Sequence, residues 1–303
     1  VYGQSFAIYA LSEYSLATGH PLGLKYAAST FDLLQKYCAD TFYGGYYENL
    51  EPDWALAPHG FAAGDRKSLD IHMHLLESFT VLALASGLEI HRRKLLEVHH
   101  LIQRHMIDPA SGCGGNQYSL DFQPLPAIAI RHTWNAEREG EAPEIPTDTT
   151  SYGHNVELSW LMKRALNVLQ VDLAPYQSVM RRLVEHALAH GVDWEYGGVY
   201  RDGVASGEAL ILEKEFWQNA EALVGFLDAY QSFGEERYFE AFETCWNFVR
   251  QYMIIPGVGE WRTLLDRQGS PIDTKIGNPW KVAYHSGRAL LESVNRLEEL
   301  GGE

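Results

Sequence analysis

Short glycine-rich turns recur along the chain between pairs of helical segments, and they constrain the fold more than any other feature. The turns begin at Gly44, Gly114, Gly197 and Gly257, roughly 60–80 residues apart. Each glycine-rich turn permits a tight change of direction, and the aromatic residues that follow it can pack beneath as a short hairpin. Helix pairs joined in this way cannot each bury an apolar face alone, so the repeat predicts a toroid or solenoid of helical hairpins.

Apolar residues at helical spacing predict nine helices. We expect them at about 1–19, 22–38, 66–86, 91–106, 152–169, 173–190, 214–233, 236–252 and 279–298. The long connection 108–150 is rich in proline and glycine, so we expect it to be functional or to form hairpins of its own. An all-α closed ring, the α/α barrel, fits the large supply of aromatic residues. An open α-solenoid that binds other proteins is the alternative.

The composition limits the classes of function. The 303 residues include 8 Trp, 17 Tyr and 12 Phe, enough apolar area for one large core or at most two smaller ones. The net charge of −16 argues against nucleic acid or an anionic membrane as a partner, since both attract basic surfaces. No apolar run approaches the roughly 18 residues of a membrane span. The three cysteines are far apart and match no zinc or redox spacing, which favours a cytoplasmic location.

Standard nucleotide-binding, serine-hydrolase and metal-binding motifs are absent from the sequence. Four segments instead place polar and aromatic residues at the start of a helix that then becomes apolar. Their candidate residues are Asp70, His74 and Glu77 in 67–77; His154 and Glu157 in 151–160; Trp217 and Glu221 in 215–221; and Trp280, His285 and Arg288 in 278–288. Each segment alone has an ordinary explanation, such as a core histidine, a helix cap or a surface carboxylate. If all four begin inner helices of one ring, their starts converge on one cavity, and together they predict an active site.

Spacing within the first two segments narrows their chemistry. Asp70, His74 and Glu77 lie at i, i+4 and i+7, on one face of a helix. His72 points elsewhere, and this divergence excludes a zinc site made of His72 and His74. His154 falls near the start of its helix, where the helix dipole lowers the pKa of a histidine and favours the neutral base.

The other two segments carry the groups that a sugar site uses. Trp217 and Glu221 share a helix face, which offers a stacking plane and an acceptor for hydroxyl groups. Arg288 lies on an apolar stripe and therefore needs a carboxylate partner, most plausibly Glu221 or Glu157.

Together these stretches resemble the N-acylglucosamine 2-epimerase superfamily, which includes cellobiose 2-epimerases, mannose 2-epimerases and related aldose–ketose isomerases. The resemblance begins at Tyr2-Gly3-Gln4 and Gly44-Gly45-Tyr46 and continues through the four segments to Arg288. It implies an (α/α)6 barrel of twelve helices that uses no redox cofactor and no essential metal. The sequence predicts nine helices, whereas the family fold has twelve. We therefore expect residues 1–303 to form a single barrel domain whose first helices are missing before Val1.

The resemblance also implies roles for the candidate residues. His154 and His285 would be the acid/base pair at C2 of a reducing sugar, and His74 would help to stabilise the enediolate. The implied substrate-binding residues, some of which would also orient the histidines, are Tyr2, Asp70, Glu77, Glu157, Trp217, Glu221, Trp280 and Arg288.

Two departures from the family pattern bear on the substrate. Asp70 stands where cellobiose epimerases usually carry Asn, and Phe216 replaces the first residue of a Trp pair. Asp70, together with the sequence of 278–288, resembles the branch acting on mannose and glucose. We therefore expect a 2-epimerase of the D-mannose/D-glucose type, with cellobiose as a further candidate substrate. The enzyme would act as a monomer or homodimer on a small-molecule sugar.

Two other functions remain as alternatives at this point. An aldose–ketose isomerase of the mannose/fructose type would use nearly the same residues, and a non-catalytic carbohydrate-binding ring would use only some of them. Glycoside hydrolysis fits less well, because it needs two carboxylates flanking a glycosidic oxygen and the predicted site is rich in histidine.

Overall fold

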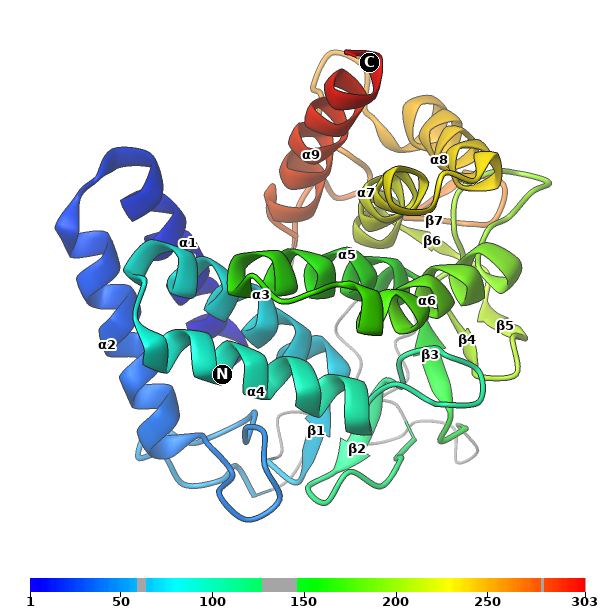
Figure 1. Ribbon diagram of the computed structural model, residues 1–303. Helices are drawn as coiled ribbons and strands as arrows, with labels where there is room; N and C mark the ends of the chain where they lie inside the picture. The colour runs from blue at the N-terminus through cyan, green and yellow to red at the C-terminus, as the bar shows by residue number, and fades with distance from the viewer. Residues whose placement is uncertain (59–63, 127–145, 279–280, 303) are drawn as a thin grey trace.

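The structure is a computed structural model that describes residues 1–58, 64–126, 146–278 and 281–302. Nine α-helices lie within these residues (Figure 1). They are α1 (Tyr2–Thr18), α2 (Pro21–Tyr37), α3 (Leu69–Ser86), α4 (Glu89–His105), α5 (Tyr152–Leu169), α6 (Gln177–His190), α7 (Phe216–Phe233), α8 (Glu236–Phe248) and α9 (Tyr284–Gly301). The predicted helices are confirmed, although 66–68 and 214–215 are strands and α9 begins later than expected. None of the described helices is both long and apolar enough to cross a bilayer.

Alternate helices form two layers. The helices α1, α3, α5, α7 and α9 pack side by side in that order as the inner layer. The helices α2, α4, α6 and α8 each pack outside the inner helix that precedes them. The inner helix α3 is buried along most of its length, whereas the outer helix α4 buries one stripe that includes Leu95, Val98 and Ile102. This arrangement is that of an α/α barrel, the fold class expected from the sequence.

The inner layer is less tightly joined between its first and last helices. In the described residues, α1 and α9 lack the extensive packing that joins the other inner neighbours. They meet through aromatic rings, with Tyr284 of α9 lying 4.8 Å from Phe6 and 6.0 Å from Tyr9 between ring centroids.

Small antiparallel sheets adjoin the inner helices; in Figure 1, β1 and β2 lie at the bottom, whereas β6 and β7 lie at the upper right beside α7. The strands are β1 (Arg66–Ser68), β2 (Gln117–Ser119), β3 (Thr149–Ser151), β4 (Asp202–Val204), β5 (Ala209–Ile211), β6 (Lys214–Glu215), β7 (Leu264–Leu265) and β8 (Pro271–Asp273). They pair as β1-β2, β3-β4-β5 and β6-β7-β8. The strands β1, β3 and β6 lead directly into α3, α5 and α7, so the sheets fix where three inner helices begin. Within the long connection 108–150, residues 127–145 lie outside the described part.

The expected repeat appears as a recurring hydrogen bond. The fourth residue of α3, α5 and α7 accepts a hydrogen bond from a backbone N–H of the preceding glycine-rich turn. The three bonds join Tyr46 N to His72 Nε2 (3.1 Å), Gly114 N to Asn155 Oδ1 (2.8 Å) and Val199 N to Asn219 Oδ1 (2.9 Å). His72 therefore has a structural role, which agrees with its predicted direction away from the site.

Two turns are also held by a buried lysine. Lys67 donates to Asp40 Oδ2 and to the carbonyl of Gly44, each at 2.7 Å. Lys214 repeats the pattern with Asp193 Oδ2 at 2.9 Å and with the carbonyl of Gly197. Gly44 and Gly197 both have φ of 85°, a left-handed conformation that favours glycine.

Candidate active site

The starts of the inner helices project their side chains into the centre of the ring. Ser68 caps α3 by accepting from Ile71 N at 3.2 Å, and Ser151 caps α5 by accepting from His154 N at 3.4 Å. These caps satisfy backbone donors that the first helical turn leaves unpaired. Polar residues from the amino-terminal halves of α3, α5, α7 and α9 meet, as expected from the sequence. We name this group the amino-end cluster: Asp70, His74, Glu77, His154, Glu157, Glu221, His285 and Arg288.

Arg288 of α9 is the centre of this cluster. Its guanidinium forms an ion pair with Glu77 and donates to Glu157 Oε1 at 2.7 Å and to Glu221 Oε1 at 2.6 Å. All three carboxylates are at most 2% exposed, and the guanidinium lies 4.9 Å from the ring centroid of Trp160. Arg288 therefore has three carboxylate partners. These contacts link α9 to α3, α5 and α7.

The shared arginine leaves the three carboxyl groups with different pKa values. Burial raises the pKa of Glu77, but Arg288 and His74 outweigh burial and bring it down to about 2. Burial and then the neighbouring Glu221 raise the pKa of Glu157 to about 8. For Glu221, Arg288 and His285 outweigh burial and lower the pKa. Glu157 therefore keeps its proton at neutral pH while Glu77 and Glu221 are ionised.

Glu157, Glu221 and His285 also form the one group among the described residues whose spacing would suit a metal ion, with ligand atoms within 4.8 Å of one another. Arg288 donates to one oxygen of each carboxylate, so a cation already occupies the position facing them. Their second oxygens, Glu157 Oε2 and Glu221 Oε2, are buried without a hydrogen-bond partner. The group is better suited to hold protons or accept hydroxyl groups than to bind a metal ion.

Two histidines of the cluster are neutral, and their rings both lie near the ring of the same tryptophan. The ring of Trp217 lies 4.6 Å from that of His154 and 5.5 Å from that of His285. His285 Nδ1 is 2.7 Å from Glu221 Oε1, which orients its ring and turns Nε2 away from this carboxylate. Burial lowers the pKa of both histidines, that of His154 to about 4. Both imidazoles are thus in the form that accepts a proton.

His74 differs from these two because both of its ring nitrogens face carboxylates. Nε2 is 3.2 Å from Asp70 Oδ1, and Nδ1 is 3.2 Å from Glu77 Oε2. Burial alone would lower the pKa of His74, but hydrogen bonds to Asp70 and Glu77 raise it to about 10. Tyr2, a predicted substrate-binding residue, packs edge-on against His74 with 5.3 Å between ring centroids. His74 is therefore a fixed imidazolium, which donates hydrogen bonds and does not act as a base.

Three aromatic residues of the site are missing from the set predicted by the sequence. Tyr284 donates to Glu77 Oε2 at 2.5 Å, Trp160 packs under Arg288, and the Phe6 ring lies 4.9 Å from that of His74. Helical spacing could have identified two of them. Trp160 follows Glu157 by three positions, and Tyr284 precedes Arg288 by four positions. The predicted site residue Trp280 lies outside the described residues.

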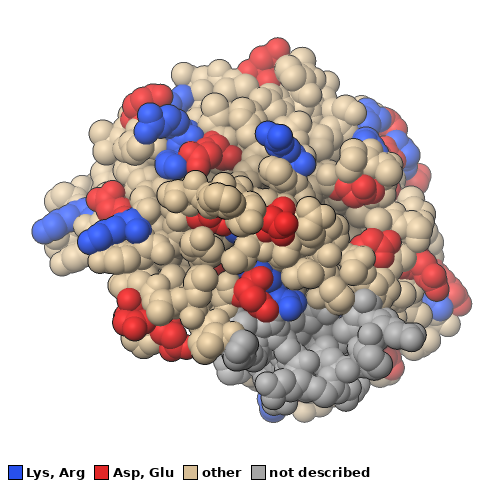
Figure 2. All heavy atoms as spheres, turned by 90° about the horizontal axis from the view of Figure 1, so that it is seen from below, with Lys and Arg blue, Asp and Glu red and all other residues tan. Residues whose placement is uncertain are grey.

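Figure 2 views the strand-bearing side, where acidic and basic side chains are interspersed.

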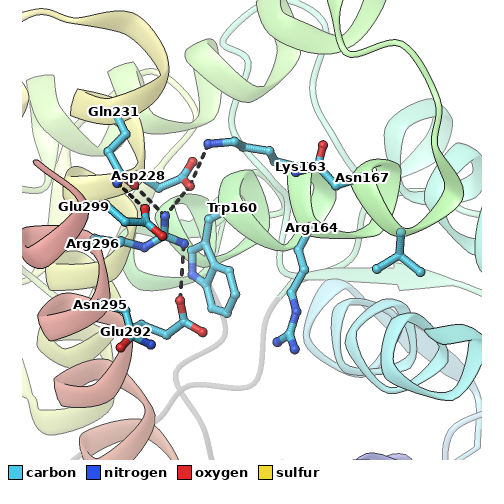
Figure 3. A pocket seen from close by; sticks show the side chains of 11 residues that line it. Trp160, Lys163, Arg164, Asn167, Asp228, Gln231, Glu292, Asn295, Arg296 and Glu299 are labelled. Carbon is cyan, nitrogen blue, oxygen red and sulfur yellow. Dashed lines mark hydrogen bonds and ion pairs between the residues drawn. The ribbon is translucent and has the colours of Figure 1, made fainter. Parts of the chain in front are cut away.

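A second polar region lies at the other end of the same helices (Figure 3). It is a pocket of about 550 Å³ between the carboxyl-terminal halves of α5, α7 and α9, which we name the carboxyl-end pocket. Asp228 pairs with Lys163 at 3.0 Å and with Arg296 at 2.9 Å. Arg164 extends away from this group in Figure 3 and pairs with Glu13 of α1 at 3.2 Å. The sequence did not predict this pocket.

Comparison with known proteins agrees with this architecture. The pattern of the N-acylglucosamine 2-epimerase (GlcNAc 2-epimerase) family matches residues 1–289. A cellobiose 2-epimerase of Ruminococcus albus is 30% identical over 305 residues, covering 97% of this chain and 71% of that protein. A D-mannose isomerase of Marinomonas mediterranea is 23% identical over 303 residues, covering 98% and 71%. The solved cellobiose 2-epimerase of Spirochaeta thermophila superposes with a TM-score of 0.83 at 28% identity, covering 99% of this chain and 70% of that one.

The chain therefore belongs to the N-acylglucosamine 2-epimerase family, and its fold is the (α/α)6-barrel type of these enzymes.

Proposed function

We propose that this protein is a sugar 2-epimerase, an isomerase that interconverts reducing aldoses differing at C2. The observation that carries the proposal is that two neutral histidines, His154 and His285, both lie against the ring of Trp217. Two bases that act on opposite faces of one carbon are what inversion at C2 requires. Relatives that are cellobiose 2-epimerases, at about 30% identity over nearly the whole chain, support the same activity.

The residues of the cluster suit the steps of this reaction. A ring-opened sugar has an aldehyde at C1, which acidifies the proton on C2. One histidine removes that proton, and the C–H electron pair passes into a cis-enediolate. The positive charge of the His74 imidazolium is suited to stabilise the negative oxygen, although both of its N–H groups already face Asp70 and Glu77. The first histidine then releases its proton to water. After rotation about the C2–C3 bond, the second histidine, which has taken a proton from water, delivers that proton to the other face of C2.

The proposed substrate is of the D-mannose/D-glucose type, with cellobiose as the second candidate. The similarity to cellobiose 2-epimerases supports cellobiose, whereas Asp70 supports the D-mannose/D-glucose type expected from the sequence. Aldose–ketose isomerisation is the other outcome that these residues permit, because returning the proton to C1 gives a ketose. We favour epimerisation, because the epimerase relatives are more similar to this chain than the D-mannose isomerase is.

Product analysis by NMR after incubation with D-mannose, D-glucose and cellobiose tests the proposal. We expect conversion of each active sugar into its C2 epimer, with no cofactor or metal added. Fructose as the main early product from mannose would replace epimerisation by isomerisation. Failure to turn over any of these sugars would favour a binding ring.

We also propose a cytoplasmic location. The three cysteines, Cys38, Cys113 and Cys245, are buried and unpaired, which supports a reducing compartment.

A further inference from the structure

Asp70 lies between two histidines that have different charges. Its Oδ1 atom is 3.2 Å from His74 Nε2 and 3.7 Å from His154 Nε2. The Asp70 side chain is 23% exposed, whereas those of His74 and His154 are 2% and 9% exposed. One carboxylate oxygen is therefore within reach of two imidazole rings that belong to two inner helices, α3 and α5.

The hydrogen-bonding partners of His74 determine its charge. A neutral imidazole carries one N–H, but His74 faces a carboxylate oxygen at each ring nitrogen. Both contacts become hydrogen bonds only when both nitrogens are protonated. His74 is consequently a permanent donor to Asp70, and this hydrogen bond fixes the carboxylate of Asp70 at the edge of the His154 ring.

The two neutral histidines thus have different carboxylate partners. His285 is bonded through Nδ1 to Glu221 Oε1 at 2.7 Å, and Glu221 is fully buried. Within the described part of the chain, His154 has an ion-pair contact with Asp70, whose Oδ1 lies beyond hydrogen-bond distance at 3.7 Å from His154 Nε2. When His154 takes a proton, its ring becomes cationic and has an N–H directed at Asp70.

We propose that Asp70 is a positioning residue that stabilises His154 in the half of the reaction in which His154 holds the C2 proton. The C2–H bond breaks, its electron pair enters the enediolate and its proton binds to His154. The resulting imidazolium is balanced by Asp70, as that of His285 is balanced by Glu221. This inference rests on the proposed function, because it assigns the two carboxylates to the two bases of a 2-epimerase.

Other charged or titratable groups face the same space and bear on the test. They are Tyr2 of α1, Glu77 of α3, Glu157 of α5, Glu221 of α7, and Tyr284, His285 and Arg288 of α9. Burial has the largest effect on the pKa of His154 and lowers it. His74 and His285 lower it further, whereas Asp70 and Glu221 raise it. A general change in acidity would affect both bases, so the test has to separate one base from the other.

Exchange of the C2 proton in heavy water makes this separation. In a two-base enzyme each epimer loses its C2 proton to one histidine, which can return solvent deuterium to the same face without inversion. Because Asp70 also holds His74, which would serve both directions, we expect Asp70→Asn to slow exchange from both epimers, and exchange from the epimer that His154 deprotonates by about tenfold more than from the other. Glu221→Gln is the matched variant, and we expect it to slow exchange mainly from the opposite epimer.

The outcomes separate this inference from the proposed function. Wild-type exchange at C2 of both epimers, with a clearly larger loss from one epimer than from the other in Asp70→Asn, supports both. Equal slowing of both epimers by Asp70→Asn, in a protein with a wild-type circular dichroism spectrum, overturns the inference and leaves the epimerase standing. No exchange at C2 with the wild-type enzyme overturns both. If Asp70→Asn folds poorly, Asp70→Ser is measured in the same way, since it also removes the charge.

Discussion

The two ends of the inner helices contain similar charged groups in different surroundings. In the amino-end cluster, Arg288 contacts three carboxylates that are at most 2% exposed. In the carboxyl-end pocket, Lys163 and Arg296 share Asp228, and their side chains are 25% and 15% exposed. Histidines lie only in the first of these two groups. Burial there separates the pKa values of neighbouring groups, so that neutral bases and a fixed cation exist side by side at one pH.

The largest expected effect concerns the two neutral histidines. We expect His154→Ala and His285→Ala each to slow epimerisation by about 100- to 10,000-fold, the usual contribution of a general acid or base. The exposed His100→Ala is the control and should retain the wild-type rate. Initial rates of epimer formation measure the effect. A variant of either site histidine that keeps the wild-type rate would remove that residue from the proposed pair.

The second prediction compares an arginine from each end. Arg288→Met leaves buried carboxylates without their cation, so we expect the free energy of unfolding to fall by about 3–5 kcal/mol. Arg296→Met breaks a partly exposed pair and should cost about 1 kcal/mol or less. Urea unfolding followed by circular dichroism gives both values. Equal losses in the two variants would contradict the contrast between the ends.

The third prediction concerns the pH dependence of stability. The folded protein holds a proton on Glu157 up to about pH 8, whereas the unfolded chain releases it near the usual value of 4.5. Because the folded state binds the extra proton, Glu157 makes stability fall as pH rises between about 4.5 and 8. The slope from this group is at most about 1.4 kcal/mol per pH unit.

Glu157→Gln removes this contribution without changing the shape of the side chain. Urea unfolding at several pH values from 6.5 to 8 should therefore show a shallower loss of stability in the variant than in the wild type. His74, whose pKa is raised to about 10, keeps a slope of the same sign in both proteins. Parallel pH profiles for the two proteins would show that Glu157 is ionised in the folded state.

The smallest expected effect is at the edge of the carboxyl-end pocket. Arg164 and Glu13 pair at 3.2 Å with side chains that are 29% and 41% exposed. We expect Arg164→Ala to lower the free energy of unfolding by at most about 1 kcal/mol and to leave the epimerisation rate unchanged. The same unfolding and rate measurements apply. A large loss of activity would indicate that the two ends are coupled more strongly than their separate ion pairs suggest.

Helical periodicity was enough to predict the nine helices, because inner and outer helices both carry long apolar stripes. The strand residues 66–68 and 214–215 fall within predicted helices, since two or three residues are too few to reveal alternation. Their pairing also depends on residues far away in the chain, such as Lys214 with Leu265.

Part of the site was readable from local spacing and part was not. The i, i+4 and i+7 positions of Asp70, His74 and Glu77 place the three on one helix face, and the structure bonds His74 to both carboxylates. The contact of Glu77 with Arg288 joins residues 211 positions apart, so only the ring arrangement could reveal it. The carboxyl-end pocket was missed because Lys163 and Arg296, taken singly, look like the exposed face of an ordinary helix.

The most direct test of the account is C2 proton exchange in heavy water, measured by NMR for both epimers with the wild-type protein, His154→Ala and His285→Ala. We predict exchange of both epimers with the wild type. Each variant should retain exchange, without inversion, for a different epimer. Absence of deuterium at C2 with the wild type, or retention of the same epimer's exchange by both variants, would contradict a site built from two opposed histidine bases.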